Sequence, residues 1–219
     1  LLRITAHNRG PDAAELHLLP QLWFRNTWSW RDGTPRPVLR VANGGVAATH
    51  PTLGEYRFKV DGKPEYLFTD NDTNVARLYG SSAPGRFFKD AFHERIVGGR
   101  LEAVNPELRG TKVAAWLPVT VPPHGSTVVR ARLSAGTRHA GFEDFDQVFT
   151  RQIEEADEFY GQIQRDLTDS DARMVQRQAF AGMIWSKQFF YYDVTEWLAG
   201  DMNQPAPPAN HRRGRNSEW

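Results

Sequence analysis

The sequence of 219 residues contains no cysteine, no long apolar run and almost no net charge. Without Cys the chain has no disulfide, no thiolate nucleophile and no cysteine-based zinc site, and its redox compartment stays open. The 27 basic and 26 acidic residues are spread along the chain, so no global field attracts nucleic acid or an anionic membrane. No window approaches the roughly 20 apolar residues of a membrane span. We therefore expect no nucleic-acid or membrane partner, and of the two compatible locations we favour the cytoplasm over the periplasm.

The two ends of the chain lack the signals of natural termini. The chain starts at Leu1 without a Met or a basic and apolar leader, and it stops at Trp219 without a helix cap or a tail composition. We expect it to be part of a longer polypeptide. Its length suffices for one large domain, or for one domain and part of a second, with about 70% of the unfolded surface buried.

The first part of the chain alternates apolar and polar side chains in short stretches separated by turn residues. Asn43-Gly44-Gly45 and Asp61-Gly62 predict hairpins, in which the runs on either side of each turn pair with one another. Two more strands are expected at residues 111–117 and 126–133. About eight short strands at such intervals predict a β-sandwich domain over residues 1–138.

Residues 69–80, TDNDTNVARLYG, place Asp70, Asp72 and Asn74 at alternate positions, as at the start of a calcium-binding loop. The segment lacks the Gly and the Glu that such a loop has at its sixth and twelfth positions. Asx turns that cap a short helix are the better interpretation. His93-Glu94 has no second His at the spacing of a zinc-protease helix, so it is not that metal site. We expect no other metal site and no cofactor.

After residue 138 the hydrophobic period changes from 2 to 3.6. Residues 142–163 carry an apolar stripe opposite a charged face, which predicts an amphipathic helix within a linker region of residues 139–170. The stretch from Gln178 to Ala199, which lies in the last segment, 171–219, contains no Pro and has apolar or aromatic groups on almost every face. It predicts one helix that other elements enclose on most sides.

Three side chains of that helix are the candidate substrate-binding residues. Trp185, Gln188 and Tyr192 follow the spacing i, i+3 and i+7, so they would share one helix face. Aromatic rings stack on the apolar faces of sugars, and amides bind sugar hydroxyls in a water-poor cleft. The alternative for each residue is packing in the core with a satisfied polar tip.

A second candidate cluster lies where an early strand is expected to give way to a loop. The segment LWFRNTWSW at residues 22–30 contains three Trp residues together with Arg25 and Asn26. Aromatic residues this dense on a loop need a partner surface. Arg25, Asn26 and Trp28 therefore contact either a neighbouring domain or a sugar, and both alternatives stay open.

Taken together, these segments resemble the front part of bacterial proteins of glycoside hydrolase family 63, the processing α-glucosidase or mannosyl-oligosaccharide glucosidase-like family. The resemblance covers most of the chain and rests on residues 22–30, 68–80, 89–97, 182–201 and 212–219. It implies a fold that is mainly β with C-terminal α: a β-sandwich, or super-sandwich, followed by a linker helix and an (α/α)6 barrel. Residues 171–219 would be the truncated start of that barrel, and the helix at 178–199 its first helix.

The resemblance also implies an activity, the hydrolysis of α-glucosidic or related bonds with inversion. One carboxylic acid protonates the leaving oxygen and one carboxylate activates water, roughly 6.5–9.5 Å away. The family's two carboxylates lie beyond the segment that 212–219 resembles, so no catalytic residue is assigned here and the chain by itself is expected to be inactive. Asp193 and Glu196, on one side of the helix, are expected to orient or cap.

The partners implied are an oligosaccharide or glucoside substrate and the remainder of the same polypeptide. The residues alone leave two alternative functions open. One is a self-contained carbohydrate-binding or scaffolding β-sandwich module, and the other is a purely structural domain that docks on a partner.

Overall fold

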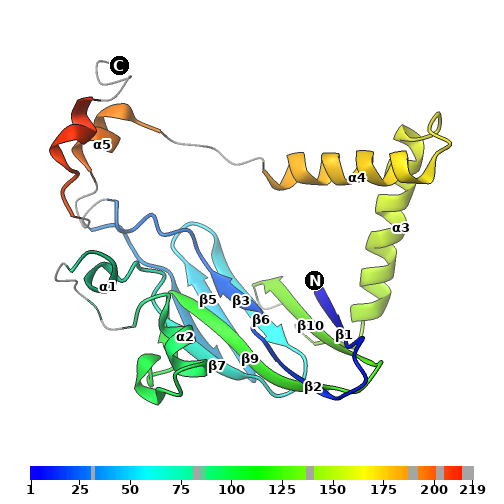
Figure 1. Cartoon of the computed structure of the whole chain (residues 1–219), viewed down its shortest axis with the longest axis horizontal. Helices are drawn as coiled ribbons and strands as arrows, with labels where there is room; N and C mark the ends of the chain where they lie inside the picture. The colour runs from blue at the N-terminus through cyan, green and yellow to red at the C-terminus, as the bar shows by residue number, and fades with distance from the viewer. Residues whose placement is uncertain are drawn as a thin grey trace. The chain divides into compact units, whose positions relative to one another are not determined.

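The computed structural model in Figure 1 describes residues 1–30, 33–80, 85, 87–136, 141–186, 192–200 and 205–213. The chain divides into two compact units. The β unit comprises Leu1–Phe142 with Ala199–Pro208, and the helical unit comprises Glu143–Leu198 with Ala209–Trp219.

The β unit has ten strands within the described residues. They are β1 (Leu2–His7), β2 (Ala14–Leu18), β3 (Gln21–Trp23), β4 (Val38–Ala42), β5 (Gly45–His50), β6 (Gly54–Val60), β7 (Glu65–Thr69), β8 (Arg109–Gly110), β9 (Lys112–Val121) and β10 (Ser126–Ala135). Its helical turns are α1 (Val75–Tyr79), α2 (Ala91–Ile96) and the 3-10 helix η1 (Leu101–Ala103).

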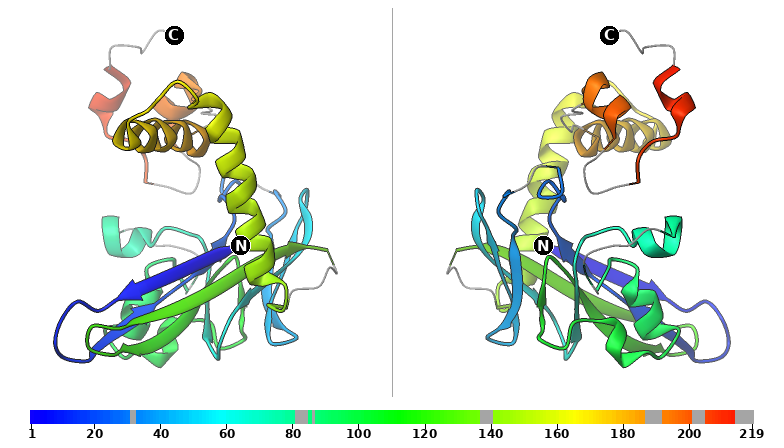
Figure 2. Two further views of the ribbon diagram at one scale, coloured as in Figure 1. Left: turned by 90° about the vertical axis from the view of Figure 1, so that its right-hand side faces the viewer. Right: turned by 90° about the vertical axis from the view of Figure 1, so that its left-hand side faces the viewer.

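The strands form two antiparallel sheets (Figures 1 and 2). One sheet has the order β1-β10-β6-β5-β4-β8, and in the other β9 pairs with β2 and β3 and also with β7. Leu39 and Phe58 from the first sheet share one apolar core with Phe68 and Val113 from the second. The two sheets therefore face each other across a common core, as in a sandwich, and the described chain is mainly β with helices towards its C-terminus, as the sequence predicts.

The two predicted hairpins have different outcomes. At Asn43 and Gly44 the prediction is confirmed, because β4 pairs with β5 and both turn residues have positive φ, 50° and 69°. At Asp61-Gly62 it is wrong, because β6 pairs with β5 and β10 whereas β7 pairs with β9. Gly62 still has the positive φ of a turn, 88°, and the Asp61 N–H donates to the Arg130 carbonyl at 2.8 Å. This turn carries the chain from one sheet to the other.

The second sheet is covered on its outer face as well. Leu67 and Ala114 on that face pack with Phe92 of α2 and with Val104, which follows η1. The side chains of β9 alternate between this cluster and the shared core, so Ala114 lies on the outer face and Val113 on the inner one. The lysine at the start of β9, Lys112, consequently lies on the same outer face as Ala114.

The helical unit contains α3 (Phe145–Ile163), α4 (Ser170–Trp185), α5 (Val194–Ala199) and the 3-10 helix η2 (Ala209–Arg213). The amphipathic helix predicted within residues 142–163 is confirmed as α3. None of the helices within the described ranges combines the length and the hydrophobicity that crossing a bilayer requires.

The single helix predicted from Gln178 to Ala199 is wrong. α4 ends at Trp185 with Ser186 as its C-cap, and a separate helix begins at Val194. Asp193 accepts a hydrogen bond from the backbone N–H of Glu196 at 3.0 Å. An Asp in this position acts as an N-cap, and a residue that starts a new helix cannot continue the previous one.

The enclosure predicted for this stretch is not provided by the described residues. α4 has no buried residue, and the side chains of Met183, Ile184 and Trp185 are 70%, 66% and 83% exposed. Large apolar side chains stabilise a helix by burial only where another surface covers them.

Candidate functional site

Side-chain hydrogen bonds around Asp72 join the loop after β3 to the loop after β7. Asn26 Nδ2 donates to Asp72 Oδ1 at 2.6 Å, and Trp28 Nε1 donates to the same oxygen at 3.3 Å. Arg36 Nη1 lies 3.6 Å from the other carboxylate oxygen. The Trp28 side chain is buried, with 5% of its surface exposed. Asn26 and Trp28 therefore brace two loops of the β unit against one another.

Asn71 and Thr111 attach these loops to the second sheet. The Asn71 amide donates to the Phe24 carbonyl at 2.9 Å, and the Asn71 backbone N–H donates to Thr111 Oγ1 at 2.8 Å. The Thr111 hydroxyl in turn donates to Asp70 Oδ1 at 3.0 Å. Because Thr111 immediately precedes β9, the position of the Trp-rich loop depends on the central strand of this sheet.

Arg25 has a different neighbour from the other two residues of its predicted cluster. Its guanidinium carbon lies 5.1 Å from the centre of the Trp30 ring, a cation–π contact, and Trp30 is 44% exposed. Trp23 at the end of β3 is 52% exposed. The exposed rings near this loop are thus Trp23 and Trp30, which the sequence analysis did not single out, whereas Trp28 packs inside.

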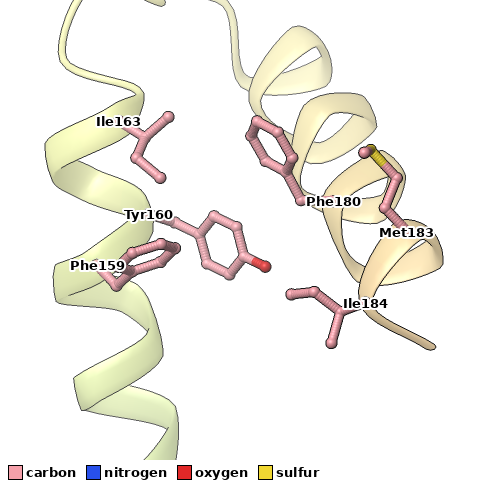
Figure 3. A pocket seen from close by; sticks show the side chains of 6 residues that line it. All are labelled: Phe159, Tyr160, Ile163, Phe180, Met183 and Ile184. Atoms are coloured by element: carbon pink, nitrogen blue, oxygen red, sulfur yellow. The ribbon is translucent and has the colours of Figure 1, made fainter. Parts of the chain in front are cut away.

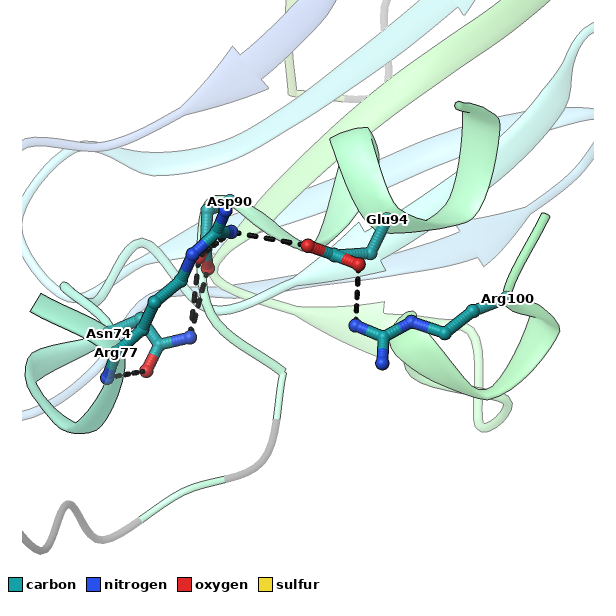
Figure 4. Close-up of polar contacts among 5 residues, drawn as sticks. All are labelled: Asn74, Arg77, Asp90, Glu94 and Arg100. Carbon is teal, nitrogen blue, oxygen red and sulfur yellow. Dashed lines mark hydrogen bonds and ion pairs between the residues drawn. The ribbon is translucent and has the colours of Figure 1, made fainter. Parts of the chain in front are cut away.

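An ion-pair cluster connects α1 with α2 and η1 (Figure 4). Arg77 Nη1 lies 3.1 Å from Asp90 and 3.2 Å from Glu94, and Arg100 binds the second oxygen of Glu94. Asn74 Oδ1 accepts from the Arg77 backbone N–H at 3.1 Å, which confirms the predicted Asx cap of a short helix. Arginines neutralise both carboxylates, and among the described residues no group of acidic and His side chains could hold a metal ion.

The three candidates at the end of the chain are only partly described. Trp185 is the last residue of α4, and Tyr192 lies before α5 with its ring 5.9 Å from that of Trp197. Gln188 lies outside the described residues. Since α4 ends at Trp185, the common helix face predicted for these residues is not formed by that helix. The capping role predicted for Asp193 is confirmed, as shown above for α5.

A hollow between α3 and α4 is lined entirely by apolar and aromatic side chains (Figure 3). The lining residues are Phe159, Tyr160, Ile163, Phe180, Met183 and Ile184. The two helices are held together beside it by Arg177, which pairs with Asp157 and lies 4.7 Å from the centre of the Tyr160 ring. Side chains on both sides of the hollow remain exposed, so this surface suits an apolar partner segment.

Replacing Asp72 with Ala is expected to destabilise the β unit by about 2 kcal/mol, because the buried Trp28 donor loses its acceptor and the half-buried Asn26 amide keeps only its bond to the Asn71 carbonyl. Urea-induced unfolding, compared with that of the wild-type chain, measures this loss. The control is Glu107→Ala, which breaks an ion pair with Arg109 whose partners are 63% and 66% exposed and should change stability by less than about 1 kcal/mol. If both substitutions lower the free energy of unfolding equally, the hydrogen bonds to Asp72 do not stabilise the β unit more than an exposed ion pair does.

Comparison with known proteins gives one similarity. No protein-family model matches the sequence, and no solved structure matches it. The chain is similar to an uncharacterized protein of Saccharomyces cerevisiae, YMR196W, with 35% identity over an alignment of 258 residues. The alignment covers 99% of this chain and 24% of the yeast protein, so the chain spans about a quarter of the length of that relative.

Proposed function

We propose that this chain is the non-catalytic N-terminal portion of a glycoside hydrolase that cleaves α-glucosidic or related bonds with inversion. In this proposal the β unit is the super-sandwich of a family 63-like enzyme, α3 is the linker helix, and α4 begins an (α/α)6 barrel. The carboxylic acid and the carboxylate that perform the reaction lie in the part of the polypeptide beyond residue 219. The proposal rests on the resemblance of the five segments named above.

The observation that carries the proposal furthest is the order of a two-sheet β unit followed by helices with uncovered apolar surface. Ile163, Met183 and Ile184 at the α3–α4 hollow are 43%, 70% and 66% exposed. The inner helices of an (α/α)6 barrel are apolar on most sides because neighbouring helices enclose them. Further helices of the same polypeptide would bury these side chains, and the greater length of the yeast relative is compatible with such an addition.

The proposed contacts with substrate are Trp185, Gln188 and Tyr192. Trp185 is 83% exposed and Tyr192 is 46% exposed, so both rings are accessible to a ligand in this chain. Trp28 is proposed as a structural brace, since its ring is buried and its Nε1–H is bound to Asp72. The substrate class is an oligosaccharide or an α-glucoside, bound where aromatic rings can cover the apolar faces of the sugar.

The test compares the full-length polypeptide with the 219-residue chain in the hydrolysis of α-glucosides, followed by proton NMR of the anomeric signals. We expect the full-length protein to release the β-anomer first and the short chain to release no sugar, because the acid–base pair is missing from it. Asp193→Asn in the full-length protein, a change in a helix cap, should preserve the anomeric outcome. Hydrolysis by the short chain that Asp193→Asn abolishes would contradict the proposal.

The exposed indoles of the β unit favour a second candidate, a carbohydrate-binding or scaffolding module. Trp23 and Trp30 offer accessible rings, and Arg25 beside Trp30 offers hydrogen-bond donors. This candidate predicts that the 219-residue chain binds gluco- or manno-oligosaccharides in calorimetry and that Trp30→Ala abolishes the heat of binding. An absence of heat with every oligosaccharide would exclude it.

A further inference from the structure

Lys112, the first residue of β9, lies between aromatic rings on the outer face of the second sheet. Its strand neighbours are Trp23 of β3 on one side and Thr69 of β7 on the other. The Lys112 Nζ lies 5.7 Å from the centre of the Trp23 ring and 5.9 Å from that of Phe92. The ammonium group is therefore held over two rings that come from different parts of the chain.

The charge of a second lysine acts on Lys112. Burial, and then the charge of Lys89, lower the pKa of Lys112 below its ordinary value. Lys89 Nζ donates to the Thr73 hydroxyl at 2.9 Å. Within the part of the chain that the structure describes, neither lysine forms an ion pair with a carboxylate.

The acidic residues of the surrounding loops bind other groups. Asp72 accepts from Asn26 and Trp28, and Asp90 is paired with Arg77. Two ammonium groups that have no carboxylate partner among the described residues and act on one another repel, and an anion bound beside them would reduce this cost. The arrangement thus has the electrostatics of a site for a negatively charged group.

A buried hydroxyl on the same face adds an unused donor. Thr69 is fully buried at 0% exposure, and its Oγ1 has no hydrogen-bond partner in the described structure. Leu67, two residues earlier on β7, packs in the outer cluster, so the pleat places Thr69 on the outer face, opposite Lys112. Buried polar groups in proteins are normally satisfied, and each exception calls for a reason such as an ion or a ligand.

We infer that Lys112 and Lys89 bind the anionic group, a carboxylate or a phosphate, of a small ligand whose ring lies against the exposed Trp23. The identity of that ring as a sugar rests on the proposed function, which makes the ligand a sugar acid or a sugar phosphate. The anion site itself depends only on the two lysines and their surroundings. Trp23, half exposed at the end of β3, supplies an apolar surface of the kind that stacks on a sugar face.

Titration calorimetry of the 219-residue chain at low ionic strength, with glucose 6-phosphate, glucuronate, inorganic phosphate and glucose as probes, tests this inference. Lys112→Met, which keeps the length of the side chain and removes its charge, should weaken binding of the charged sugar roughly tenfold or more, because charge-assisted contacts in a partly desolvated site are strong. Lys89→Met should weaken it as well. Lys63→Met, at an exposed turn position, is the matched control and should leave binding unchanged.

The probes distinguish a phosphate from a carboxylate as the bound group, and they distinguish the anion site from the sugar contact at Trp23. Stronger binding of glucose 6-phosphate than of glucuronate assigns a phosphate, and the reverse order assigns a carboxylate. If inorganic phosphate binds as tightly as glucose 6-phosphate and its binding depends on Lys112, the anion site is supported and the sugar ring is shown to contribute no affinity. Binding of every probe that is unaffected by Lys112→Met, or no binding at all, overturns the inference and leaves the proposed glycosidase function untouched.

Discussion

Replacing Trp28 with alanine is expected to lower the free energy of unfolding of the β unit by about 3–5 kcal/mol. The indole is 5% exposed, so its removal leaves a cavity where a large ring was packed. Asp72 Oδ1 accepts from Asn26 and from Trp28, and these two hydrogen bonds join the loop after β3 to the loop after β7. The substitution removes the bond from Trp28. We expect the melting temperature to fall and the second sheet, which carries these loops, to exchange its amide protons faster.

Trp30→Ala is the matched control for this prediction. Trp30 lies two residues away, is 44% exposed and makes a cation–π contact with Arg25. Its loss should change stability by less than about 1 kcal/mol. In the full-length protein, Trp28→Ala should lower the melting temperature more than it raises the Michaelis constant. The opposite ranking would falsify the assignment of Trp28 as a brace and make it a binding residue.

Gly110→Ala is expected to destabilise the β unit by about 3 kcal/mol, at the upper end of the cost of overpacking. A Cβ atom on Gly110 would lie 2.3 Å from the Thr69 carbonyl oxygen and 3.0 Å from its carbonyl carbon. Both are backbone atoms, so no side-chain rotation relieves the contact. The neighbouring Thr111 N–H donates to this same carbonyl oxygen at 3.1 Å, and the Thr111 hydroxyl bonds to the loop of Asp70 and Asn71.

The same methyl group added at Gly161 serves as the control. Gly161 lies within α3, and apart from the adjoining backbone of that helix and the two neighbouring residues no atom lies within 4 Å of the place where its Cβ would be. Alanine there should stabilise the helical unit by about 0.5–1 kcal/mol, because glycine in a helix interior is unfavourable. Urea-induced unfolding and amide exchange at Asn71 and Thr111 measure the two variants. Unchanged exchange at these residues in Gly110→Ala would show that β8 tolerates the methyl group.

The fold class was accessible from the sequence because it depends on short-range patterns. Alternation of apolar residues predicted strands in both sheets, although not the two-residue β8, and a stripe with a period of 3.6 predicted α3. An Asx cap in the segment of Asn74, and an orienting or capping role for Asp193, were accessible because each side chain bonds to a backbone N–H three residues ahead, which needs no distant partner. The wrong prediction of one helix from Gln178 to Ala199 also came from a local pattern. The hydrophobic run indicated a continuous helix, although Asp193 within it is a capping residue that begins a new one.

Strand partners depend on the whole chain. Asp61-Gly62 has the composition of a tight hairpin, but the apolar faces of β6 and β7 are buried from opposite sides of one core, and each strand pairs with a different sheet. Turn residues determine that the chain reverses, whereas burial determines which strand lies beside it. A local signal therefore predicted the turn and could not predict its partner.

The candidate sites show the same difference between local composition and distant contacts. The sequence by itself determined that aromatic, amide and acidic residues crowd the segments around Trp28 and Asp72, and that the chain changes from β to α. Only the tertiary structure decided that Trp28 is buried against Asp72, 44 residues away, while Trp23 is exposed. Likewise, Lys112 and Phe92 meet because β9 lies beneath α2. Contacts between residues this far apart follow from burying both faces of the second sheet, a requirement that acts on the folded chain as a whole.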